Sequence, residues 1–146
     1  MGIVNNKEHV MGTRALTFVY DEHNEAILNV YRQYDGYIEG HGRELAEFLA
    51  GKTLVNGFGR ESTDIANGMG CLAASLVANF KDTVGGFYIH SVTSTDCGQD
   101  YEYHVYEDKV IVKGYPESFI RFEHGGLVNR FEGTWAEFAE FCKVAA

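Results

Sequence analysis

Two pairs of strand-like segments, each joined by a short polar turn, constrain the fold of this chain more than any other feature. The first pair spans residues 14–20 and 25–33, and the second spans residues 101–107 and 109–115. Tyr101, Tyr103 and Val105 alternate with polar side chains, which is the period of a strand with one buried face. Polar residues separate the two strands of each pair. Both pairs are therefore predicted to be antiparallel β-hairpins.

Three further segments have the apolar spacing of α-helices. The helices are predicted over residues 43–50, 69–81 and 134–144. Thr134 and Glu137 have the spacing of a capping box, in which each side chain binds the backbone N–H of the other residue. Residues 86–92 and 118–123 predict additional strands.

These elements predict an α+β fold. We expect an antiparallel sheet of five or six strands built from hairpins, with two or three helices packed on it. A chain of 146 residues suits one domain, placed here over residues 12–146. Residues 1–11 are polar and are predicted to form a flexible leader.

Composition excludes several classes of partner. The net charge is −9 and the basic residues form no cluster, which disfavours direct binding of nucleic acid or of an anionic membrane surface. There is no run of 18 apolar residues and no secretory signal. The three cysteines lack CxxC spacing, which predicts free thiols in a cytoplasmic protein. We expect no bound cofactor.

The densest group of functional side chains lies in residues 31–45, where the chain leaves a strand, crosses a glycine-rich loop and enters a helix. The group comprises Tyr31, Arg32, Tyr34, Asp35, Tyr37 and His41. Loops held between rigid elements often carry function. The tyrosines predict a surface for stacking a base, with Arg32 and Arg43 binding a phosphate.

The same region carries a resemblance. Thr13-Arg14-Ala15-Leu16-Thr17, Tyr34-Asp35-Gly36-Tyr37 and Gly40-His41-Gly42 resemble segments of small phage and prokaryotic proteins. Those proteins begin Met-Gly-Thr-Arg and carry an aromatic-Asp-Gly-Tyr loop. The resemblance covers about residues 11–50. It implies a mobile-element origin, hence the cytoplasm of a host cell, and it implies no particular reaction.

The interpretation that follows is a phage-type accessory binding protein, acting in counter-defence or host takeover. It would sequester a small nucleotide-like ligand or cap a basic host protein, and its aromatic content would suit a homodimer. The predicted ligand-binding residues are Arg14, Arg32, Tyr34, Asp35, Tyr37, His41 and Arg60. The Gly68–Gly70 turn before a helix is a candidate cradle for an anion. The capping alternative uses acidic residues between positions 96 and 108.

A small hydrolase is the enzymatic alternative, with Asp35 polarising His41 as a general base. A metal site is less expected, because the six histidines include no HExxH motif. His90 and His104 would have to be neighbours on adjacent strands to form one.

Cys97 is a further candidate nucleophile if a histidine reaches it, although nearby Asp96 and Asp100 would raise its pKa. Cys71 and Cys142 are predicted to be packing residues on helices.

Overall fold

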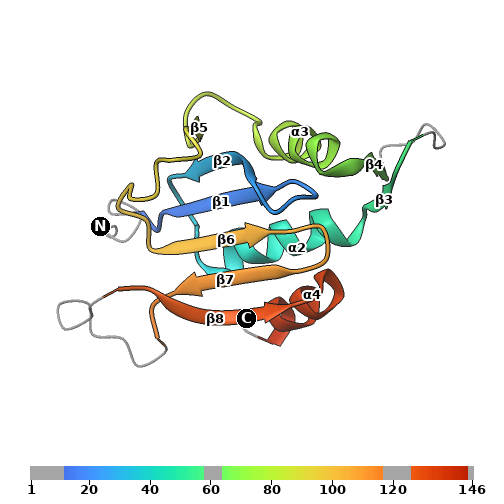
Figure 1. Ribbon diagram of the computed structural model, residues 1–146. Coiled ribbons are helices and arrows are strands. Elements are labelled where there is room, and N and C mark those ends of the chain that lie inside the picture. Colours follow the sequence, from blue (N-terminus) through green and yellow to red (C-terminus); the bar gives the residue numbers. More distant parts are fainter. Residues whose placement is uncertain (1–11, 58–63, 117–125, 145–146) are drawn as a thin grey trace.

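The computed structural model describes residues 12–57, 64–116 and 126–144, and its central feature is a six-stranded sheet with the strand order β5-β2-β1-β6-β7-β8 (Figure 1). The strands are β1 (Ala15–Tyr20), β2 (Ala26–Arg32), β5 (Phe87–His90), β6 (Tyr101–Val105), β7 (Val110–Gly114) and β8 (Val128–Gly133). Both predicted hairpins form, as β1–β2 and β6–β7. The two hairpins meet at the centre of the sheet.

The central strand pair is parallel, whereas every other pair in this sheet is antiparallel. The chain leaves β5 at one edge of the sheet and crosses residues 91–100 before it enters β6 beside β1. A crossover of this kind brings β6 alongside β1 in the same direction. The expected number of strands and the α+β class are confirmed. The two hairpins, however, pair with each other through parallel strands, β1 and β6.

Three α-helices pack on one face of this sheet. They are α2 (Arg43–Ala50), α3 (Gly68–Phe80) and α4 (Trp135–Val144). Strand residues Val19, Val30 and Tyr103 share a hydrophobic cluster with Leu49 and Leu72 of the helices. Because side chains alternate across a strand, the odd positions of β1 face the helices and the even positions face away. The main core is thus the layer between the sheet and the helices.

The opposite face is partly covered by the crossover loop. The Asn29 side chain is fully buried, and its Nδ2 donates to the carbonyls of Ser91 and Ser94 at 2.9 Å each. Leu16 and Phe18 are also buried on this face, at 0% and 4% exposure. The crossover loop therefore covers part of the sheet face that lies opposite the helices.

Several local predictions are confirmed. Helix α2 has the expected bounds, α3 begins and ends one residue earlier than expected, and α4 begins one residue later than expected. The capping box of α4 forms, with Thr134 N donating to Glu137 Oε1 at 2.8 Å and Glu137 N donating to Thr134 Oγ1 at 3.1 Å. Strand β8 was not predicted, and the expected strand over residues 118–123 lies outside the described residues.

Two short strands, β3 (Thr53–Val55) and β4 (Ile65–Asn67), form a separate parallel pair next to α3. Among residues 12–57, 64–116 and 126–144, no helix is long and apolar enough to cross a membrane.

Candidate functional site

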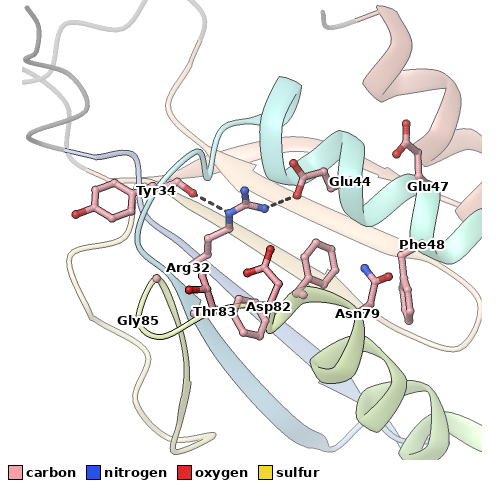
Figure 2. A pocket seen from close by; sticks show the side chains of 12 residues that line it. Arg32, Tyr34, Glu44, Glu47, Phe48, Asn79, Asp82, Thr83 and Gly85 are labelled. Carbon is pink, nitrogen blue, oxygen red and sulfur yellow. Dashed lines mark hydrogen bonds and ion pairs between the residues drawn. The ribbon is translucent and has the colours of Figure 1, made fainter.

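A pocket of about 490 Å³ opens between α2, the C-terminal end of α3 and the turn over residues 81–86 (Figure 2). Its described lining residues are Arg32, Tyr34, Glu44, Glu47, Phe48, Asn79, Phe80, Asp82, Thr83, Gly85, Gly86 and Phe87. Figure 2 shows Asn79 and Asp82 in the space between α2 and α3, and Arg32 reaching toward Tyr34 and Glu44 at its edge. The size of the pocket is that of ordinary small-molecule sites.

Arg32, the last residue of β2, is held rigidly at the wall of this pocket. Its Nε donates to the Tyr34 carbonyl at 2.8 Å, and its Nη1 donates to His41 Nδ1 at 3.1 Å and to Glu44 Oε1 at 2.7 Å. These are its hydrogen bonds within the described residues, and none of them uses Nη2. The two Nη2 N–H donors therefore have no hydrogen-bond partner among the described residues, while the other bonds fix the orientation of the guanidinium.

His41 is a structural group behind Arg32. It is fully buried, and its Nε2 lies 2.8 Å from Thr17 Oγ1. Because a guanidinium can only donate, Nδ1 must be the acceptor and Nε2 must carry the proton that is donated to Thr17. Burial, followed by the positive charge of Arg32, lowers the pKa of His41 to about 3. The imidazole is neutral at physiological pH, and both of its nitrogens are engaged.

Asp35 shapes the loop and does not reach the His41 ring by a hydrogen bond. Its φ is +62°, its carbonyl accepts from the His41 backbone N–H at 2.8 Å, and its carboxylate accepts from the Tyr37 hydroxyl at 3.2 Å. A side chain at Gly40 would lie 2.5 Å from the Asp35 carbonyl oxygen, so the loop requires glycine there. The chain then enters α2 through a π-helical turn, η1 (Ile38–Gly42).

The other predicted ligand-binding residues are dispersed. Tyr34 lines the pocket, but Tyr37 does not. Tyr31 stacks on His90 across the sheet, on the face away from the helices, so the tyrosines do not form one stacking surface. Arg14 contacts the crossover loop: its backbone N–H donates to Asp100 Oδ2 at 3.1 Å. Arg60 lies outside the described residues.

The predicted anion cradle before α3 is filled by the protein itself. Gly68 has a φ of +83°, and the backbone N–H of Met69 donates to Glu22 Oε2 at 2.7 Å. Glu22 comes from the β1–β2 turn, so its carboxylate takes the place that a phosphate would occupy. The carboxylate caps the helix and attaches the hairpin to it.

The acidic residues between positions 96 and 108 do not form one surface. Asp100 is 5% exposed, and Glu102 accepts hydrogen bonds from Gln99 and His104. Glu107 and Asp108 are exposed at the far end of β6. Strand β6 thus separates the remaining exposed carboxylates.

His90 and His104 lie on two strands that are not neighbours in the sheet. His90 is paired with Asn29, and strands β2 and β1 lie between it and His104, so the adjacency that a metal site at these two histidines would require does not occur. No group of three or more histidine, cysteine or acidic side chains suited to a metal is present in the described ranges. The predicted contact of a histidine with Cys97 does form, with 3.2 Å between His90 Nδ1 and Cys97 Sγ.

Two of the cysteines, Cys97 and Cys142, have raised pKa values. Burial, with the charge of Asp96 beside it, raises the pKa of Cys97, so the group remains a thiol at neutral pH. Cys142 is buried as predicted, with a pKa raised by burial to about 12. Cys71 is exposed, so its predicted packing role is wrong.

A second hydrogen-bonded chain lies on the sheet face away from the helices. Tyr20 hydroxyl and His104 Nδ1 are 2.6 Å apart, and His104 Nε2 is 3.0 Å from Glu102 Oε1. The bond to His104 is the main cause that lowers the pKa of Glu102, while burial raises the pKa of Tyr20. Tyr20 also stacks on Tyr106 with ring centroids 4.2 Å apart. The chain stiffens the centre of the sheet.

The sequence prediction missed the half of the pocket contributed by α3 and the turn after it. Asn79, Phe80 and Asp82 lie about 40 residues from the tyrosine loop in sequence and carry no motif. The run Asp82-Thr83-Val84-Gly85-Gly86 after a helix was the available signal, since such turns often shape pockets.

Comparison of the chain with protein-family models, with curated proteins and with solved structures finds no match.

Proposed function

We propose that the chain is a binding protein that holds a small nucleotide-like ligand in the pocket beside Arg32. Sequestration of such a ligand is the action expected of a phage or mobile-element accessory protein in counter-defence or host takeover. The supporting observation is the fixed Arg32 guanidinium, which lines a pocket with aromatic walls and whose Nη2 makes no hydrogen bond within the described residues. Rigid donors beside aromatic rings are what a planar heterocycle requires.

Binding has more support than catalysis. The described lining residues include no histidine, cysteine or lysine, and their carboxylates are hydrogen-bonded to no lining hydroxyl that they could activate as a nucleophile. His41 lies behind Arg32 with both ring nitrogens engaged, and its low pKa leaves it a poor proton acceptor near neutral pH. The hydrolase alternative with Asp35 would need both groups rearranged.

Capping of a basic host protein is the other sequence-based alternative. It loses support because Asp100 and Glu102 turn inward and the exposed carboxylates lie at opposite ends of β6. The pocket is therefore the better candidate for the functional site.

Isothermal titration of nucleosides and nucleotides into the untagged full chain tests the proposal. Asn79→Trp should fill the pocket and abolish binding, since Asn79 is an exposed lining residue on α3. Ala78→Trp is the matched control, because Ala78 is exposed on the same helix but does not line the pocket. We expect micromolar or tighter binding that Asn79→Trp removes and Ala78→Trp preserves. Absence of binding across the panel, or equal effects of the two variants, would refute the proposal.

Native mass spectrometry of the same material adds an independent readout. A ligand carried through purification appears as an adduct that is lost on denaturation, and the native mass also reports whether the chain is a homodimer.

A further inference from the structure

We infer that the pocket holds the base of its ligand, with guanine matching best, and leaves the phosphates in solvent; this rests on the proposed function and specifies how the ligand is oriented. The charge of the side chains that line the pocket is the first reason for this orientation. Arg32 is the one cationic side chain among the described lining residues, against the carboxylates of Glu44, Glu47 and Asp82. Since Arg32 already pairs with Glu44, two carboxylates remain uncompensated. A phosphate inside would meet net repulsion.

The backbone adds to this preference. Helix α3 ends at Phe80, beside the pocket, and the C-terminal end of a helix carries partial negative charge. The nearby ammonium of Lys81 is engaged with the carbonyls of Gly85 and Phe87 at 3.3 Å and 3.0 Å. It is therefore not directed at an anion in the pocket.

The apolar part of the lining suits a flat ring. Phe80 and Phe87 stack with ring centroids 5.8 Å apart, and Phe48 meets Phe80 at 6.2 Å. All three phenylalanines line the pocket. A base placed against these rings would bury its faces and keep its edges for hydrogen bonds.

The polar groups then select the edges of the base. Arg32 Nη2 makes no hydrogen bond within the described residues, and the carboxylates of Glu47 and Asp82 form no ion pair or hydrogen bond there, so the lining includes donors and acceptors without partners. The complementary base has an acceptor edge next to an amino and imino donor edge. Guanine has O6 and N7 as acceptors and N1–H and N2–H₂ as donors, so it matches both walls.

The test compares guanosine, GTP and inosine by isothermal titration with the full chain. We expect guanosine and GTP to bind within about threefold of each other, and inosine, which lacks the amino group, to bind about tenfold more weakly. Asp82→Asn should reduce the preference for guanosine over inosine to about threefold or less. Glu107→Gln is the matched control, since it removes the same charge at an exposed hairpin turn and should leave the preference unchanged.

The outcomes separate this inference from the proposed function. Binding of GTP at least tenfold tighter than guanosine, with Asp82→Asn strengthening it, would overturn the base-inward orientation and leave the binding function intact. Nucleotide binding without a preference among bases would also overturn the base-inward orientation and leave the binding function intact. If none of the three ligands binds, the guanine inference fails, and the proposed function fails with it only if the full panel of nucleosides and nucleotides also shows no binding. Glu47→Gln provides a second variant should Asp82→Asn lower the melting temperature.

Discussion

Replacing His41 by glutamine should change how the stability of the protein depends on pH. The folded-state pKa of His41 is lowered to about 3 from an ordinary value of 6.5 by burial and by Arg32. The unfolded chain therefore binds a proton between these values that the folded chain cannot bind. The stability is fully present above pH 6.5 and is lost as the pH falls toward 3.

The magnitude follows from the two pKa values. Each pH unit inside this window is worth about 1.36 kcal/mol. Between pH 7 and pH 5 the proton binding of His41 should lower the free energy of unfolding by about 2 kcal/mol. Asp21 and Glu102 also have lowered pKa values, but carboxylates act on stability mainly below about pH 4.5 and contribute little in this range.

The glutamine variant isolates this effect. Its amide oxygen can accept from Arg32 and its amide nitrogen can donate to Thr17, so both hydrogen bonds of His41 survive without a titrating group. We expect His41→Gln to cost about 1–2 kcal/mol at pH 7 through imperfect packing. Its loss of stability between pH 7 and pH 5 should be about 2 kcal/mol smaller than that of the wild type.

Urea unfolding at half-unit pH steps measures both quantities. His23→Gln is the control, because His23 is exposed in the β1–β2 turn, and it should keep the wild-type pH dependence. Parallel pH profiles for wild type and His41→Gln would falsify the assignment of His41 as a buried neutral histidine. That result would also reopen its use as a general base.

Three further predictions concern other contacts. Glu22→Gln should lower stability by about 0.5–1.5 kcal/mol in urea unfolding, because a neutral cap interacts less with the N-terminal end of α3; unchanged stability would argue against the cap. Thr134→Ala should cost about 1 kcal/mol by removing one bond of the α4 capping box, and a wild-type urea midpoint would contradict it. In the native protein Cys71 should react readily with a thiol reagent while Cys142 reacts only on unfolding, and equal rates would show that the α4 packing is wrong.

Local features of the sequence predicted local structure well. Leu45, Phe48 and Leu49 form the buried stripe of α2, and Gly51 follows its end, as the spacing indicated. The hairpins follow from alternation and polar turns, which act over a few residues. Strand β8 was missed because Phe131 is its main contribution to the core and the strand lacks a clear apolar alternation.

The sequence did not predict contacts between segments that lie far apart along the chain. The parallel pairing of β1 with β6 depends on where the crossover loop lies, and no local pattern specifies that path. For the same reason the sequence left open whether His90 and His104 lie on adjacent strands, and the structure separates them by β2 and β1. The pocket escaped prediction in part because Asp82 and Asn79 meet Arg32 only after α3 packs on the sheet.

The central claim is that a ligand occupies the pocket beside Arg32, and residue-resolved NMR tests it most directly. A ¹H–¹⁵N correlation spectrum of the full chain would be followed during titration with guanosine monophosphate. The account predicts that the Arg32 Nε–H, the Asn79 side-chain amide and the Gly85 amide shift first, since all three residues line the pocket. Amides at Asn29 and Gly98, near the crossover loop on the other face, should remain in place. Shifts confined to that face, or no shifts at millimolar ligand, would contradict the account.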